Sequence, residues 1–216
     1  RPDVVINCIG VVKQLAGADD PAVAMPINAE FPHRLAELCA ARSTRLVHIS
    51  TDCVFAGTHG RYTEADPTDA QDLYGRSKLL GEVDAAHAIT LRTSIIGPEL
   101  GTAHGLLAWF LAQRGTVNAY TRAVFSGLPT VELARAIRDH VLTHPGLHGI
   151  YHVAAEPIAK AELLRLLAQA YAHPVALRAV AEPVIDRSLD GRRFEAATGF
   201  VAAPWPVLVE RMHAFG

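Results

Sequence analysis

Tyr74 and Lys78 are the two side chains of this sequence best suited to a shared proton transfer. They lie four residues apart in a stretch, 73–83, that we predict to be helical, so both occupy one helix face. A phenol has a pKa of about 10, and a neighbouring ammonium group lowers that pKa by favouring the phenolate. Such a phenol can donate a proton to a carbonyl oxygen while hydride reaches the carbon. The same spacing occurs on many solvated helix faces. Whether this pair is functional therefore depends on the elements around it.

The elements around this pair alternate between strands and helices. Continuous apolar runs at 4–9, 45–50 and 88–96 predict strands that are buried on both faces. Apolar residues at helical spacing predict a helix over 28–42, between the first two strands. This alternation predicts a parallel sheet with right-handed crossovers. The polar stretch 52–72, rich in Gly, Asp, Pro and Thr, predicts a surface loop.

The second half of the chain has a mixed pattern. It predicts helices at 106–113, 131–142 and 161–171, and a short strand at 149–153. We interpret the first half as a nucleotide-binding type of sheet. We interpret the second half as a mixed lobe that packs against the carboxyl edge of that sheet.

Polar side chains gather at the predicted carboxyl ends of three strands. They are Asn7 and Cys8, then Ser50, Thr51 and Asp52, then Thr93 and Ser94. In an open parallel sheet, ligands bind beyond this edge. The alternative is that these residue types simply favour loop starts and helix caps.

Three strings around these residues carry a family resemblance. They are ISTDCVFAG (49–57), LYGRSKLLGE (73–82) and LRTSIIGP (91–98). Their order and spacing resemble the extended short-chain dehydrogenases/reductases, most closely the dTDP-4-dehydrorhamnose reductase group. That group has a hydroxyl-Thr-Asp-x-Val-Phe-x-Gly strand end, a Y-G-x-[ST]-K helix and a later Arg-Thr strand. The resemblance continues through FSGLPTVELARAI, GIYHV and DRSLD, and so covers nearly the whole chain.

The resemblance implies a fold and its division. The expected fold class is α/β, with the second half of a Rossmann-type doubly wound parallel sheet and a small mixed α/β lobe. Residues 1–98 would form the C-terminal half of the NAD(P)-binding domain and carry the catalytic residues. Residues 99–216 would be mainly a substrate-binding lobe, with 131–153 packing back on the sheet.

The resemblance also implies catalytic roles. Tyr74 would be the general acid, and Lys78 would lower its pKa and hold the nicotinamide ribose. Thr51 would hydrogen-bond the sugar ketone, together with Ser50. The implied activity is NAD(P)H-dependent reduction of a 4-keto-6-deoxy nucleotide sugar, which feeds surface-polysaccharide synthesis.

Further residues would bind the two ligands. The cofactor, NADP or NAD, would contact Tyr74, Lys78 and Ser50 together with Asn7, Cys8, Ser94 and Ile95. The substrate would contact Ser50, Thr51, Val54, Phe55 and Arg187. The resemblance also leaves a homodimer open as the assembly.

The sequence departs from the family in what it lacks. Neither G-x-G-x-x-G nor G-x-x-G-x-x-G occurs, so the helix-start pyrophosphate site is missing. The family carries that motif on a strand and turn that would precede Arg1. We therefore expect a chain truncated at its N-terminus, with the 4–9 strand as an exposed edge and no turnover by the 216 residues alone. Cys53 and Ala56 also differ from the family pattern near the substrate.

Two alternatives stay open beside the reductase. An epimerase or 4,6-dehydratase has the same fold, but a dehydratase places Asp-Glu directly after the Thr, whereas Cys53 follows Asp52 here. A non-catalytic protein is the other alternative, since the regulatory subunit of methionine adenosyltransferase has this fold. The complete set of Thr51, Tyr74 and Lys78 argues against the second alternative, and a turnover assay would separate the two.

Composition excludes several classes of protein. The net charge is −2 without a basic run, which argues against nucleic-acid binding. No apolar run approaches the 18 residues of a membrane span. The three cysteines match no zinc or redox pattern, and a reducing cytoplasm suits them. Four histidines recur every four residues from 140 to 152, but Pro145, Gly146 and Gly149 interrupt them, so we expect no metal site.

Overall fold

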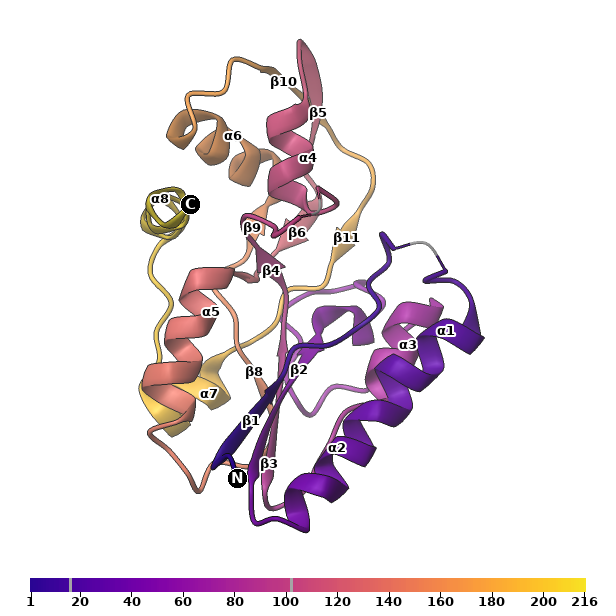
Figure 1. Ribbon diagram of the computed structural model, residues 1–216. Coiled ribbons are helices and arrows are strands. Elements are labelled where there is room, and N and C mark those ends of the chain that lie inside the picture. The colour runs from indigo at the N-terminus through magenta and orange to yellow at the C-terminus, as the bar shows by residue number, and fades with distance from the viewer. Residues whose placement is uncertain (16, 102) are drawn as a thin grey trace.

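A four-stranded parallel sheet forms the centre of the larger lobe (Figure 1). The computed structural model describes residues 1–15, 17–101 and 103–216. The sheet has the order β1-β2-β3-β8, with β1 at Val4–Asn7, β2 at Arg45–Thr51, β3 at Ala88–Thr93 and β8 at Gly149–His152. All three strand pairs are parallel. The expected α/β class with a parallel sheet is confirmed.

Helices cover both faces of this sheet (Figure 1). One face carries α1 (Pro21–Met25), α2 (Phe31–Ala40) and α3 (Leu73–Leu80), and the other carries α5 (Thr130–Ala136) and α7 (Arg192–Thr198). Successive strand residues point to opposite faces. Leu46 therefore packs with Ala36 and Cys39 of α2, whereas Val47 packs in the main core with Ile137, which follows α5.

The helix between β1 and β2 begins earlier than the predicted position 28. The Asp20 side chain caps α1 by accepting a hydrogen bond from the Ala22 backbone N–H, and Pro21 occupies the first helical turn, where its missing N–H costs nothing. A π-helical turn at Pro26–Glu30 then joins α1 to α2. This turn places Asn28 on the inside of the helical segment, where its side chain is buried.

The smaller lobe contains short strands and three helices. In Figure 1 it lies above the main sheet. Its helices are α4 (Leu106–Ala112), α6 (Lys160–Ala170) and α8 (Trp205–Phe215). Its strands pair as β5 (Thr116–Tyr120) with β10 (Ala176–Val180), as β6 (Ala123–Phe125) with both β9 (Ile158–Ala159) and β11 (Ile185–Asp186), and as β4 (Ile95–Ile96) with β7 (Leu128–Pro129).

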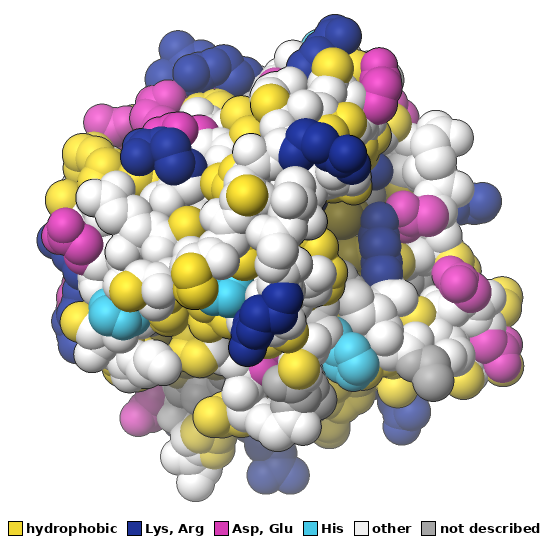
Figure 2. Space-filling model, turned by 90° about the horizontal axis from the view of Figure 1, so that it is seen from above, with side chains coloured by type: hydrophobic (Ala, Val, Ile, Leu, Met, Phe, Trp, Pro, Cys, Tyr) yellow, Lys and Arg dark blue, Asp and Glu magenta, His cyan; other side chains and the backbone are white. Residues whose placement is uncertain are grey.

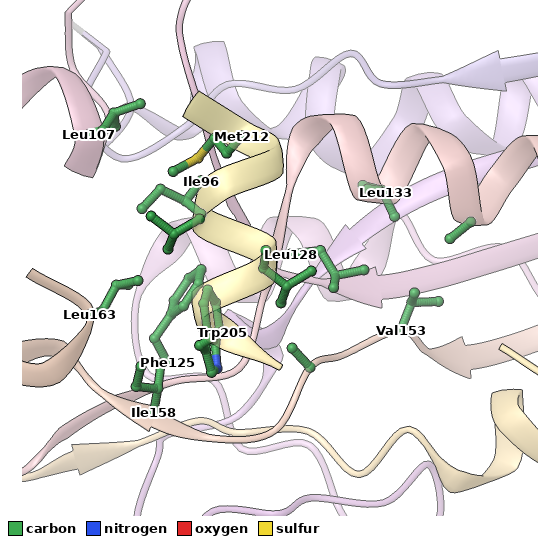
Figure 3. Packing of buried hydrophobic residues seen from close by; sticks show 14 of the residues in the cluster. Ile96, Leu107, Phe125, Leu128, Leu133, Val153, Ile158, Leu163, Trp205 and Met212 are labelled. Carbon is green, nitrogen blue, oxygen red and sulfur yellow. The ribbon is translucent and has the colours of Figure 1, made fainter. Parts of the chain in front are cut away.

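The core of the smaller lobe is continuous with that of the sheet. Phe125 of β6, Leu163 of α6, and Trp205 and Met212 of α8 pack together (Figure 3). The Trp205 indole N–H donates to the Glu156 carbonyl oxygen at 2.6 Å, so its one polar atom is satisfied. This packing fixes the lobe against the edge of the sheet where the strands end.

Two predicted strands are shorter than their apolar runs. The run 88–96 divides at Ser94: β3 ends at Thr93, and Ile95–Ile96 form β4 in the other lobe. The Ser94 carbonyl oxygen accepts the Leu128 N–H at 2.8 Å, which draws the chain out of the main sheet. The run 4–9 forms a strand only to Asn7, and β1 is an edge of the described sheet, with Ile6 44% exposed.

The stretch 52–72 is only partly the predicted surface loop. It begins with a 3₁₀ turn at Asp52–Val54, and its Val54, Phe55 and Tyr62 side chains are buried with Leu189. Phe55 and Tyr62 stack at 4.2 Å between ring centroids. The loop therefore has a small apolar core of its own.

No helix among residues 1–15, 17–101 and 103–216 is both long and apolar enough to cross a membrane.

Candidate active site

The carboxyl ends of β1, β2 and β3 meet at one edge of the sheet, as the parallel arrangement requires. Thr51, the last residue of β2, lies opposite Thr93, the last residue of β3. The Thr51 hydroxyl oxygen accepts the Cys53 backbone N–H at 3.1 Å and so caps the 3₁₀ turn that follows. This cap turns the chain away from the sheet directly after Thr51.

Helix α3 carries Tyr74 toward the same edge. It begins at Leu73 because the Asp72 carboxylate accepts the Gly75 N–H at 2.7 Å. Gly75 permits a close approach to the turn after β2, since a Cβ there would lie within 3.0 Å of the Cys53 carbonyl oxygen. The glycine of the Y-G-x-[ST]-K motif therefore allows Tyr74 to lie beside Thr51.

Tyr74 is held in its neutral form. Burial raises the pKa of its hydroxyl above the ordinary value, and the charges of Asp52 and Asp72 act in the same direction. The hydrogen bond with Thr51 opposes this shift without cancelling it. This rise in the pKa of Tyr74 is opposite to the lowering that the Tyr74–Lys78 spacing predicts. A neutral phenol is nevertheless the form that can donate a proton.

Lys78 is buried one helical turn after Tyr74. Its Nζ donates to the Ile49 carbonyl oxygen at 2.8 Å, on the backbone of β2. Burial lowers the pKa of Lys78 to about 8, whereas Glu82 and Cys8 act to raise it. An ammonium group has three N–H donors, and in the part of the chain that is described only one of them has an acceptor. The other two are available to a ligand hydroxyl.

Asn28 is a site residue that the sequence analysis did not identify. Its side chain accepts the Val11 N–H at 2.8 Å and donates to the Val11 carbonyl at 2.9 Å and to Ser77 Oγ at 3.1 Å. It thereby joins the segment after β1 to the helix of Tyr74. A polar residue between Pro26 and Pro32, inside an otherwise apolar helix face, was the only signal for it.

A cleft of about 510 Å³ opens beside the strand ends. It is lined by Ser94, Ile95 and Arg187, three of the predicted ligand residues, and also by Lys13 and Lys160. Lys13 Nζ lies 2.5 Å from the Asp72 carboxylate and 5.5 Å from the centre of the Tyr74 ring. Figure 2 shows Lys and Arg side chains at the border of a hollow on this side of the molecule. Asp52 and Glu99 also line the cleft, so its three cationic side chains are the part suited to an anionic ligand.

Comparison with known proteins assigns the family. The model of the RmlD substrate binding domain matches residues 1–213. The chain belongs to this family.

Two curated relatives illustrate the match. A dTDP-4-dehydrorhamnose reductase of Mycobacterium tuberculosis is 44% identical over 85 residues, which are 37% of this chain and 28% of that protein. The Haloferax volcanii protein named "Probable low-salt glycan biosynthesis reductase Agl14" is 32% identical over 165 residues, 71% of this chain and 54% of that protein. The chain thus matches about a quarter to a half of the length of these relatives.

A solved structure shows the same fold. The dTDP-4-dehydrorhamnose reductase of Bacillus anthracis, determined in complex with NADP, superposes with a TM-score of 0.86. The match covers 100% of this chain and 81% of that one at 20% sequence identity. The Rossmann-type assignment of the sheet rests on this likeness together with the parallel strand order.

Several predicted ligand residues of this RmlD-family chain are engaged within the protein. Asn7 donates to His48 Nδ1 at 3.0 Å and accepts the Ile9 N–H at 3.1 Å, so only its neighbour Cys8 is exposed. Ser50 donates to Glu82 at 2.7 Å and points to the sheet face opposite Thr51. The structure does not bring Ser50 and Thr51 together on one ligand atom.

Val54 and Phe55 also differ from their predicted substrate contacts. Both side chains are fully buried in the core of the 52–72 loop, because the loop folds inward over Tyr62. Phe55 borders the cleft only through its carbonyl oxygen, which accepts Arg187 Nε at 2.8 Å. Their contribution is to hold Arg187 and the turn at Asp52–Val54 in place.

Proposed function

We propose that the protein carrying this chain reduces the 4-keto group of a 4-keto-6-deoxy nucleotide sugar, with NADPH or NADH as the reductant. The observation that carries this proposal is the half-buried, neutral Tyr74, hydrogen-bonded to Thr51 at the carboxyl edge of a parallel sheet. Membership of the RmlD family supports the same reaction class.

The proposed step uses the hydroxyls of Tyr74 and Thr51 as donors to the ketone oxygen. When bound, the reduced nicotinamide would supply a hydride to the carbonyl carbon. The π electrons of the C=O bond would move to oxygen, which would then take the proton of Tyr74. The fixed Thr51 hydroxyl would stabilise the developing negative charge. The product would be the corresponding 4-hydroxy sugar.

The residues of this chain suit one half of the cofactor. Lys78 has two uncommitted N–H donors for ribose hydroxyls, and Cys8 is exposed beside it. Ser94 and Ile95 border the cleft where the nicotinamide would meet the sugar. The pyrophosphate would need a glycine-rich turn, and these 216 residues contain no such motif. The proposal therefore assigns only the nicotinamide–ribose half to this chain.

The charge of the cleft supports a nucleotide diphosphate as the rest of the substrate. Among the described residues, Arg187 donates only through Nε, to the Phe55 carbonyl oxygen. Its two Nη nitrogens have no partner among those residues. Lys160 likewise makes no ion pair with them. Lys13 and Arg187 also both lower the pKa of Asp52, which burial raises. Cations in this arrangement suit phosphate oxygens.

The site argues against a dehydratase. That reaction needs a carboxylic acid directly after the Thr-Asp pair, and the position holds Cys53. Burial raises the pKa of the Cys53 thiol to about 11, with a smaller contribution from Asp52. The thiol therefore stays protonated near neutral pH and cannot serve as the base.

Three further expectations are parts of this proposal. We propose a division near residue 98 into a sheet portion with the catalytic residues and a mainly substrate-binding lobe. A cytoplasmic location agrees with the three free cysteines Cys8, Cys39 and Cys53. A homodimer agrees with the exposure of two large apolar side chains, Leu38 on α2 and Leu80 on α3.

Steady-state assays test the proposed reaction. A 4-keto-6-deoxy nucleotide sugar is mixed with NADPH or NADH, and loss of the reduced cofactor is followed by absorbance. The assay uses this chain and a form that supplies a glycine-rich pyrophosphate-binding segment ahead of Arg1. We expect sugar-dependent oxidation by the second form. Binding of both ligands without turnover would instead support a non-catalytic protein.

A further inference from the structure

A row of three buried polar side chains crosses the sheet one residue before Thr51. Ser50 on β2 lies opposite Arg92 on β3, and Arg92 lies opposite His152 on β8. All three are buried on the α3 side of the sheet. Buried polar groups persist where they are hydrogen-bonded, so each of them needs a partner beneath α3.

Glu82, two residues beyond the end of α3, is the partner of two of them. Its Oε1 accepts Ser50 Oγ at 2.7 Å and Arg92 Nε at 2.8 Å, and its Oε2 accepts Arg92 Nη2 at 2.7 Å. The Glu82 and Arg92 side chains are 4% and 5% exposed. A bidentate pair of this kind has a fixed geometry. The pair therefore ties the segment after α3 to β3, and the Ser50 hydrogen bond ties the same segment to β2, the strand that ends at Thr51.

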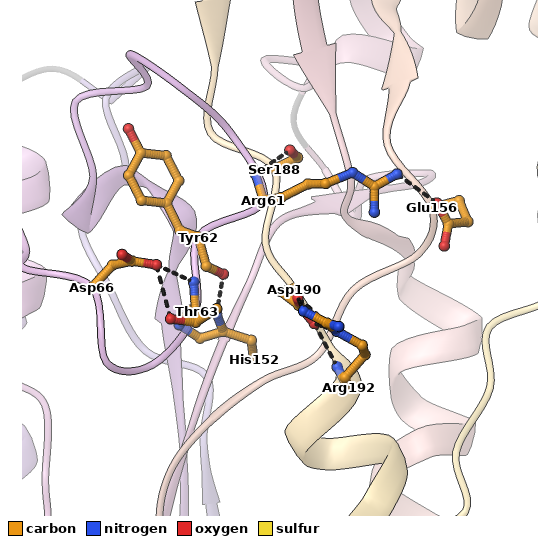
Figure 4. A network of polar contacts seen from close by, with 9 residues as sticks. All are labelled: Arg61, Tyr62, Thr63, Asp66, His152, Glu156, Ser188, Asp190 and Arg192. Atoms are coloured by element: carbon orange, nitrogen blue, oxygen red, sulfur yellow. Dashed lines mark hydrogen bonds and ion pairs between the residues drawn. The ribbon is translucent and has the colours of Figure 1, made fainter.

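The other end of the row holds the 52–72 loop. Arg92 Nη1 lies 3.4 Å from His152 Nε2, which must accept because arginine only donates. His152 Nδ1 then carries the proton and donates to the Tyr62 carbonyl at 2.9 Å (Figure 4). Burial lowers the pKa of His152 to about 4, which agrees with this neutral tautomer. The Arg92 guanidinium also lies 5.4 Å from the centre of the Phe55 ring.

We propose that Glu82 and Arg92 are positioning residues for the reaction, a role that rests on the proposed function. Their ion pair joins three parts of the site: the α3 helix, the end of β2 and the loop that holds Arg187. Glu82 also lies four residues after Lys78, and its negative charge acts to raise the pKa of Lys78. Neither residue lines the cleft, so both act through Tyr74, Lys78 and Thr51.

The charge on Lys78 gives a readout that a purely structural pair would not move. The titratable groups that face Lys78 are Glu82 beyond its own helix, Cys8 at the end of β1 and His48 on β2. His48 is neutral, because burial and the Lys78 charge lower its pKa to about 3. Loss of the Glu82 carboxylate should therefore lower the pKa of Lys78, and activity should fall at a lower pH on the alkaline side.

The test compares Glu82→Gln and Ser50→Ala with Glu162→Gln as the matched control. Glu162 forms an exposed pair with Arg165 on α6 and is not among the residues that line the cleft. Glu82→Gln should lower kcat by about tenfold or more, with a smaller change in KM for the cofactor. The alkaline limb of the pH–activity profile of Glu82→Gln should move to lower pH by about half a unit or more. Ser50→Ala should lower kcat by about threefold to tenfold, and it should lower thermal stability because the buried Glu82 carboxylate loses one donor.

Each outcome bears on the inference. An unchanged kcat and alkaline limb in Glu82→Gln would overturn it, as would a Ser50→Ala variant that changes only KM. If Glu82→Gln does not fold, the kcat of Ser50→Ala tests the inference instead, and an unchanged kcat would overturn it. If the wild type shows no turnover, the proposed function fails, and the Lys78 titration is measured by NMR of labelled lysine. In that case an unmoved Lys78 pKa in Glu82→Gln would contradict the positioning role itself.

Discussion

Replacement of Gly75 by alanine should separate the position of Tyr74 from its chemistry. Gly75 follows Tyr74 and lies against the turn after β2. A Cβ at this position would fall within 3.0 Å of both the Cys53 carbonyl oxygen and the Ala70 Cβ. The Cys53 oxygen belongs to the backbone and cannot rotate away. The helix or the turn must therefore move.

The size of the movement follows from the contact to Ala70. The new Cβ would lie 2.9 Å from the Ala70 Cβ, and ordinary contacts begin at 3.4 Å. A shift of at least about 0.5 Å is needed, and the Cys53 oxygen demands more. A misplacement of about 1 Å at a reacting group can cost about a hundredfold in rate. We expect Gly75→Ala to lower kcat by about tenfold to a hundredfold.

The assay is steady-state reduction of the keto sugar, with thermal unfolding measured in parallel. Gly146→Ala is the matched control, since a Cβ there would meet no atom within 4 Å. Alanine within a helix gains up to about 1 kcal/mol over glycine, which offsets part of the roughly 1–3 kcal/mol cost of overpacking, so the melting temperature should fall modestly while kcat falls much more. A kcat equal to the wild-type value would refute the argument that Gly75 sets the place of Tyr74.

Three further substitutions have defined outcomes. Because burial lowers the pKa of Lys78 to about 8, the unfolded chain binds more protons between pH 8 and 10.5, and stability should rise with pH in that window. Lys78→Met should abolish this rise and add roughly 2 kcal/mol of unfolding free energy at pH 7, measured by urea unfolding; a pH-independent difference would contradict the assignment. Arg187→Ala should raise KM for the nucleotide sugar about tenfold and change kcat less, and an unchanged KM would remove Arg187 from the binding site. Asn28→Ala should cost about 1–3 kcal/mol, because the buried Val11 N–H loses its acceptor, and an equally stable variant would show that the segment after β1 is held otherwise.

The parts of the fold that depend on local pattern could be predicted from the sequence. The apolar runs gave strands at the right places because a strand buried on both faces must be apolar throughout. Tyr74 and Lys78 share a helix because local residues start and accommodate it. Asp72 caps its first turn, and Gly75 lets it pack closely against the turn after β2. The early start of α1 carried a local signal too, in Asp20 followed by Pro21.

The parts that depend on distant contacts could not be predicted. Residues 95 and 96 continue an apolar run, yet they pair with β7 because Ser94 is bound to Leu128, more than thirty residues away along the chain. Ser50 and Thr51 are neighbours in sequence, but Glu82 holds only Ser50. The pKa of Tyr74 depends on how deeply the surrounding loop buries it, which the four-residue spacing to Lys78 does not specify.

The most direct test of the account follows the hydride and the proton in one experiment. Reduced cofactor labelled with deuterium at the transferable position is supplied with the keto sugar, and the product is analysed by mass spectrometry and NMR. We predict one deuterium at C4 of the product, and a Tyr74→Phe variant that keeps cofactor affinity but is slower by about two to four orders of magnitude. A product without deuterium, or a Tyr74→Phe variant that reduces the sugar at the wild-type rate, would contradict the assignment of Tyr74 as the acid of a nucleotide-sugar reductase.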